Sequence, residues 1–151
     1  MKTVQPIRDK KKIAIMKTLL KEKGDKYYIL FRIGINVGLR VSDILLLKVS
    51  DVRAKTHVTI VEKKTGKVRR FLIPNSLQKE IAEFIRTNNM EDDEYLIQSR
   101  KGFNKPITRV QAYRVLNDIA KQIGLMKKRM SYCYALKSIK ATMKMFLLKL
   151  N

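Results

Sequence analysis

The feature that most constrains the fold is a change of hydrophobic period around residues 57–74. The stretch "HVTIVEK" alternates and is rich in β-branched residues, and "VRRFLIP" alternates again before Pro74 closes it. Between them lies "KTGK", which has the composition of a turn. Alternation with a period of two on both sides of a short turn is typical of a β-hairpin. These residues therefore predict an antiparallel hairpin.

The segments on both sides of this hairpin have the helical period instead. Apolar residues recur every three or four positions, and glycines at 24, 38 and 124 end three of the runs. The expected helices cover residues 9–23, 25–38, 41–52, 75–89 and 107–124. Residues 95–98 could add a short third strand, and the apolar residues 131–151 suit a further helix. The predicted fold is α+β, mainly helical, with a small antiparallel sheet.

Side chains that could cap or bury these helices can be named. Expected N-terminal caps are Ser42 or Asp43, Asn75 or Ser76, and Thr108, because these short polar side chains accept bonds from free backbone N–H groups. The first helix should turn Ile13, Met16, Leu19 and Leu20 inward, and the fourth should bury Leu77, Ile81 and Phe84 or Ile85.

Length and composition predict one domain over residues 1–151, with no linker and no internal repeat. One cysteine and one histidine allow neither an internal disulfide nor a Cys/His metal cluster, so no metal is expected. Unpaired cysteine fits a reducing cytoplasm. The N-terminus lacks the apolar core of a signal peptide, and no apolar run is long enough to span a membrane. We therefore expect a cytoplasmic protein with no membrane partner.

The net charge of +21 points to a polyanionic partner. So much self-repulsion is unusual in a small domain, and nucleic acid is the leading candidate. A lysine-rich surface that only keeps the protein in solution remains an alternative. The charge is uneven: eight Lys or Arg and no acidic residue follow Asp118, and the one acidic cluster is "EDDE" at 91–94. That cluster should face away from a polyanion.

Several motifs in order resemble the tyrosine recombinases, the phage integrase family. The segment "GINVGLRVSDILLLKVSDV" looks like the first conserved box of that family. The hairpin "KKTGKVRRFLIP" is similar to the one that carries the family's catalytic lysine, and "PITRVQAYRVLNDIAKQIGL" follows in the expected place. The resemblance covers residues from about 3 to 125. It implies the catalytic-domain fold of DNA breaking-rejoining enzymes, duplex DNA as partner, and chemistry without metal or cofactor.

The resemblance implies a role for Arg40 as the first family arginine, which binds the reacting phosphate. A guanidinium can hold two phosphate oxygens, and the start of a helix also favours an anion. Asp43 would orient that guanidinium or cap the helix. By itself, Arg40 could equally be an ordinary surface arginine.

The resemblance matches Lys64 to the hairpin lysine that protonates the leaving 5′ oxygen. A lysine in a positive, partly desolvated site can have its pKa lowered enough to release a proton. Lys63 and Lys67 are neighbours that could be confused with Lys64, and all three could be plain turn residues. Arg69 and Arg109 are expected as further DNA-binding residues.

The second family box is where the sequence departs from the pattern. The family has His-x-x-Arg, whereas the corresponding "YALK" here places Tyr134 and Lys137 at those positions. A lysine is a point charge and cannot replace the two-pronged guanidinium, and a tyrosine does not titrate near neutrality. All six tyrosines precede the position of the family's nucleophile. We expect a partial catalytic domain without the family's N-terminal DNA-clamping domain.

The leading interpretation is an integrase-like DNA-binding domain that acts in DNA integration and recombination and does not cleave DNA by itself. A non-catalytic DNA-binding regulator is one alternative. Another is a modulator that associates with an intact recombinase. In isolation the chain is expected to be a monomer, since analogy with the family places its assembly contacts beyond residue 151.

Overall fold

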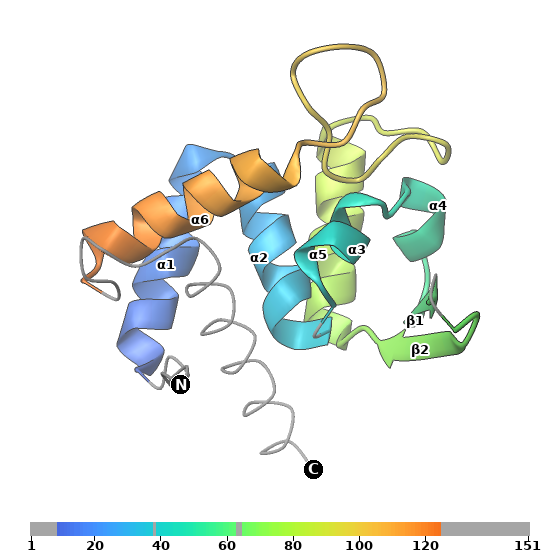
Figure 1. Cartoon of the computed structure of the whole chain (residues 1–151), viewed down its shortest axis with the longest axis horizontal. Helices are drawn as coiled ribbons and strands as arrows, with labels where there is room; N and C mark the ends of the chain where they lie inside the picture. Colours follow the sequence, from blue (N-terminus) through green and yellow to red (C-terminus); the bar gives the residue numbers. More distant parts are fainter. Residues whose placement is uncertain (1–8, 38, 63–64, 125–151) are drawn as a thin grey trace.

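The computed structural model describes residues 9–37, 39–62 and 65–124. In order along the chain, these form α1 (Lys10–Lys23), α2 (Asp25–Val37), α3 (Val41–Leu45), α4 (Val49–Val52), β1 (His57–Val61), β2 (Val68–Leu72), α5 (Asn75–Thr87) and α6 (Arg109–Gln122) (Figure 1). The prediction of a mainly helical α+β fold with a small antiparallel sheet is confirmed. None of the helices in these ranges is both long and apolar enough to cross a lipid bilayer.

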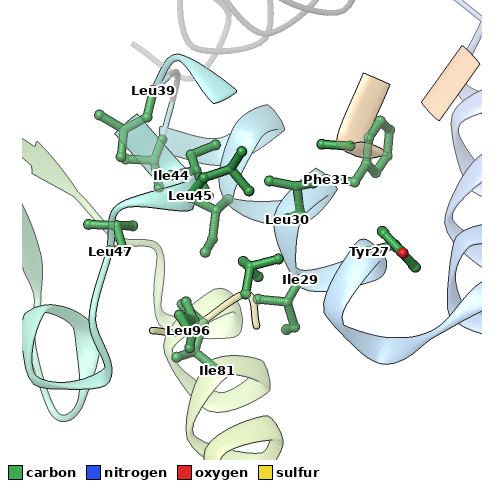
Figure 2. Packing of buried hydrophobic residues seen from close by; sticks show 14 of the residues in the cluster. Tyr27, Ile29, Leu30, Phe31, Leu39, Ile44, Leu45, Leu47, Ile81 and Leu96 are labelled. Atoms are coloured by element: carbon green, nitrogen blue, oxygen red, sulfur yellow. The ribbon is translucent and has the colours of Figure 1, made fainter. Parts of the chain in front are cut away.

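Helix α2 is the centre of the core. It is buried on almost every side, as expected of a helix that is apolar all round, and α1, α3 and α5 pack against it. Figure 2 shows Ile81 of α5 and Leu96 beside Ile29, with Ile44 and Leu45 of α3 near Leu30. Each fully buried side chain of this size stabilises the fold by about 1.5–3 kcal/mol. This packing fixes where α3 begins.

The ends of α1 follow the local sequence signals. The Asp9 carboxylate accepts a bond from the backbone N–H of Lys11 at 2.9 Å and so caps the first turn. Gly24 follows the last turn with a φ of +154°, a conformation that favours glycine. Four residues of this helix were predicted to face inward. Leu19 is partly buried, and the other three, Ile13, Met16 and Leu20, are buried.

The prediction of one helix over residues 41–52 is wrong, because the chain forms two short helices there. The N–H of Val49 donates to the carbonyl of Glu94 at 2.9 Å, and the N–H of Leu96 donates to the carbonyl of Leu47, also at 2.9 Å. Backbone groups bonded across to residues 92–96 cannot continue a helix. The predicted caps are also absent, since Arg40 is the N-cap of α3 and no side chain caps that helix.

The possible third strand at residues 95–98 does not join the hairpin. Within the described part of the chain, the sheet holds β1 and β2 alone, in a register from His57 opposite Leu72 to Val61 opposite Val68. Residues 95–98 form two isolated bridges instead, Lys48 with Tyr95 and Gln98 with Pro106. They therefore link the α3–α4 region to the segment before α6.

Of the caps predicted for α5 and α6, the first is wrong and the second is confirmed. Pro74 is the N-cap of α5, without a side-chain bond, so the prediction of Asn75 or Ser76 is wrong. Proline has its φ already set near a value that suits the entry to a helix. The predicted Thr108 cap is confirmed, since its hydroxyl accepts a bond from the N–H of Gln111 at 3.1 Å. This cap fixes the start of α6.

A partly buried ion pair ties α2 to α5. Arg32 donates from Nε and Nη2 to the two carboxylate oxygens of Glu80, at 2.8 and 3.1 Å. The two side chains are 11% and 32% exposed. Burial alone would lower the pKa of Arg32, but the hydrogen bonds and charge of Glu80 outweigh it and raise that pKa. Burial, and then the nearby charge of Arg32, lower the pKa of Lys17.

We expect Arg32→Met to lower the free energy of unfolding by about 3 kcal/mol. The substitution leaves Glu80 charged, largely buried and without its partner, which is the costly way to break such a pair. Urea unfolding followed by circular dichroism measures the change. The matched control is the double variant with Glu80→Met, in which an apolar pair should recover most of the stability. A single variant within about 1 kcal/mol of the parent would show that the pair contributes little.

Candidate nucleic-acid interface

Arg40 stands at the surface between two anchored residues. Leu39 before it and Ile44 after it are buried in the core. The Arg40 carbonyl accepts bonds from the N–H groups of Asp43 and Ile44, both at 3.0 Å, which closes the first turn of α3. Its side chain is exposed. The backbone under this guanidinium is thus held in place, while the charged group itself faces solvent.

Asp43 lies in the first turn of α3 but does not engage Arg40 in this structure. The ion pairs in the described ranges join Arg32 to Glu80, Arg53 to Asp92 and Arg69 to Glu62. The Asp43 carboxylate therefore lies farther than 4 Å from the Arg40 guanidinium, and it does not cap the helix. Its role as an orienting group remains a prediction.

The two faces of the hairpin differ in what they offer an anion. The buried Val58 pairs with Phe71, so the face that holds this pair and Arg69 turns toward the core. Arg69 is tied to Glu62 by a 2.7 Å contact between Nε and Oε1. The opposite face includes Arg70, which is exposed and makes no ion pair within the described residues. Arg69 was predicted from the sequence as a DNA-binding residue, whereas Arg70 was not.

The lysines of the hairpin turn are placed only in part. Lys63 and Lys64 lie outside the described residues, so the role that the resemblance gives to Lys64 stays a prediction. Lys67 is exposed, and its carbonyl accepts a bond from the N–H of Glu62 at 2.9 Å. Gly66 adopts a φ of +66°, a left-handed conformation that favours glycine at this position of the turn.

Arg109 opens α6 directly after the Thr108 cap. It is exposed, and its guanidinium lies over the ring of Tyr113, 5.8 Å from the ring centre. The start of this 14-residue helix carries a partial positive charge, so the arginine and the helix favour an anion together. Tyr134 and Lys137, the residues matched to the second family box, lie outside the described residues.

The elements that carry these cations lie in two parts of the molecule. The connection between α2 and α3 lies in the lower part of the view in Figure 1, as does the hairpin, whereas α6 begins higher, beside the long loop that precedes it. The hairpin contacts α4, which follows α3 along the chain. The connection that carries Arg40 and the hairpin thus lie in the same part of this view, and α6, which carries Arg109, begins in another.

Two further cations near the start of α6, Lys26 and Arg100, belong to no motif and were not predicted from the sequence. The ammonium of Lys26 donates to the carbonyl of Gln98 at 3.0 Å. Burial, and then the charge of Arg100, lower the pKa of Lys26. A clue was available in "SRKGFNK", where three cations surround a phenylalanine.

As for metals, no three His, Cys, Asp or Glu side chains gather into a possible site within residues 9–37, 39–62 and 65–124.

Comparison with known proteins identifies the family. A family model described as the phage integrase family matches residues 7–134. The "Probable integrase/recombinase YoeC" of Bacillus subtilis is 47% identical over 125 residues, which cover 83% of this chain and 67% of that protein. "Tyrosine recombinase XerA" of Pyrococcus furiosus is 28% identical over 102 residues, which cover 67% of this chain and 35% of that protein.

Solved structures agree on the fold. A crystal structure of XerA recombinase superposes with a TM-score of 0.73 at 17% identity, over 99% of this chain and 53% of that one. Lambda integrase bound to DNA gives 0.69 at 14% identity, over 98% and 54%. The chain thus spans about two thirds of the Bacillus relative and about half of these structures. The chain belongs to the phage integrase family.

Proposed function

We propose that this chain is a duplex-DNA-binding domain of an integrase or site-specific recombinase, and that it acts in DNA integration and recombination. One observation carries the proposal: Arg40, which the resemblance matches to the family's phosphate-binding arginine, stands exposed on a fixed helix start and outside every ion pair of the described residues. The net charge of +21 supports a polyanionic ligand. Lambda integrase, a structural neighbour, was solved bound to DNA.

In this proposal Arg40 and Lys64 meet at one phosphate of the DNA backbone. Arg40 supplies two parallel N–H donors, and its charge persists at any working pH. The resemblance assigns Lys64 the second contact with this phosphate, and Lys63 and Lys67 are its near neighbours in the sequence. Asp43 turns toward the guanidinium once the phosphate is bound. Arg69 must leave Glu62 to contribute, whereas Arg70 is already available on the other face of the hairpin.

The second box sets the limit of the proposed activity. With Tyr134 and Lys137 in place of the family's histidine and arginine, the chain lacks one bidentate phosphate contact and one imidazole. The function is therefore DNA binding without strand cleavage by this polypeptide, and without a cofactor. The same two residues favour a second candidate, a non-catalytic regulator or a modulator of an intact recombinase. We place the protein in the cytoplasm. In the absence of DNA it is a monomer, because its net charge opposes self-association.

We expect Arg40→Ala to weaken duplex binding about threefold and to reduce the salt slope by about one, since one phosphate contact is lost among several. Fluorescence anisotropy of an end-labelled duplex measures both. The matched control is Arg86→Ala, an exposed arginine in the last turn of α5, which removes the same charge away from the site. Equal losses in the two variants would mean that Arg40 contributes only general charge and no phosphate site.

A further inference from the structure

The loop of residues 99–105 displays an aromatic ring to solvent. The Phe103 side chain is 90% exposed, more than any other large hydrophobic side chain of the described residues. A single exposed apolar residue is common in proteins and needs no explanation by itself. What distinguishes Phe103 is the loop that carries it.

The loop is held in a defined shape. The N–H of Ser99 donates to the carbonyl of Lys105 at 2.7 Å, which closes the base of the loop. The side chain of Asn104 accepts a bond from the N–H of Tyr95 at 2.9 Å and donates to the carbonyl of Asp93 at 3.2 Å. Phe103 therefore sits on a braced support and not on a loose tail.

The charged side chains within the loop are all of one sign. Arg100, Lys101 and Lys105 are exposed within the loop, and Arg109 follows at the start of α6. No acidic residue occurs between positions 95 and 117. Lys26 adds a fifth cation, because its ammonium donates to the carbonyl of Gln98 at 3.0 Å, next to the base of the loop. The acidic residues 91–94 lie on the side of Asn104 and mark one edge of this basic surface.

We propose that this loop is a second DNA contact, in which the five cations bind backbone phosphates and the Phe103 ring enters a groove to stack on a base. This proposal rests on the proposed function, since the ligand is the same duplex DNA. Aromatic and apolar side chains carried between cations serve other DNA-binding proteins as stacking platforms and as wedges between base steps. The loop stands at the upper end of Figure 1, away from the hairpin, so this contact lies apart from the Arg40 phosphate.

Charge complementarity selects DNA over a protein partner. An apolar pocket on a protein would accept the ring, but it would also have to present carboxylates to Arg100, Lys101 and Lys105. A duplex offers phosphates on both sides of each groove and bases between them. The phosphates of a duplex thus pair with the cations while its groove accepts the ring.

The absence of tryptophan from the chain allows a direct test. Phe103→Trp creates a single tryptophan, whose emission should be quenched when duplex DNA is added, because the indole stacks on a base. The matched control is Ile15→Trp, which places the probe on an exposed position of α1 and should keep its emission. Excitation at the red edge of the indole band avoids absorption by DNA.

Affinity provides the second readout. Phe103→Ala should weaken duplex binding about fivefold, at the lower end of what one base–aromatic stack contributes. The substitution is at an exposed site, so the thermal midpoint should stay the same. If the parent binds DNA while Phe103→Trp is not quenched, the loop proposal fails and the proposed function stands, whatever the affinity of Phe103→Ala. If the parent does not bind duplex DNA, both proposals fail.

Discussion

The affinity for duplex DNA should fall about a thousandfold when monovalent salt rises from about 50 to 200 mM, if about six phosphates are contacted. Each phosphate that a lysine or arginine neutralises releases condensed counterions, and salt opposes that release. The candidates are Arg40, Lys64, Lys67, Arg70 and Arg109, with the loop cations in addition. Because phosphates carry no sequence information, duplexes of different sequence should bind with similar affinity.

Anisotropy titrations at five or six salt concentrations give the slope of log affinity against log salt. Arg40→Ala in the same series provides the calibration, because the loss of one phosphate contact should change the slope by about one. A slope near zero, or an affinity that differs strongly between unrelated duplexes at every salt concentration, would contradict binding through the backbone.

The sequence was sufficient where the structural signal is local. A period of two on both sides of "KTGK" predicts the hairpin, and the structure has it in a single register from His57 to Val61 against Val68 to Leu72. The caps Asp9 and Thr108 act on N–H groups two or three residues away, so the sequence contains both partners. Glycines 24 and 124 adopt positive φ at the ends of α1 and α6, as their positions suggest.

The sequence was insufficient where distant backbone segments meet. The apolar run "VSDILLLKVSDV" has a helical period throughout, yet hydrogen bonds to residues 92–96 divide it into α3 and α4. For the same reason residues 95–98 bridge to Lys48 and Pro106 and not to the hairpin. No pattern within residues 41–52 reveals that they bond to residues 92–96, which lie more than 40 positions along the chain.

The candidate site shows the same division. The motif around Arg40 located an arginine at a helix start, and the structure places it there. Which cations are already paired depends on folding: Arg69 is bound to Glu62, and Arg32 is bound to Glu80 from another helix. No partner was predicted from the sequence for the arginine inside the apolar run "YYILFRIGINV", although a charge there requires one.

Nicked duplex DNA should form no covalent adduct with this polypeptide. The family's cleavage step needs a tyrosine hydroxyl beside an activated phosphate, and four of the six tyrosines have other contacts. Tyr27 is buried and its hydroxyl accepts a bond from Gln111 at 2.8 Å. Burial raises the pKa of Tyr28, and Glu80 raises it further, which disfavours the phenolate. Tyr95 and Tyr113 lie under the cations of Lys48 and Arg109.

The remaining pair, Tyr132 and Tyr134, lies outside the described residues, so the assay must address it directly. Denaturing gels of the protein with a labelled, nicked duplex detect a phosphotyrosine bond, and a full-length tyrosine recombinase with its own nicked substrate serves as the positive control. Loss of a catalytic nucleophile costs on the order of 10⁶ in rate in a well-studied protease, so the expected signal is none. An adduct that forms reproducibly and disappears in Tyr132→Phe or Tyr134→Phe would overturn the proposal of binding without cleavage. It would also show that residue to be the nucleophile, despite its place before the family's usual position.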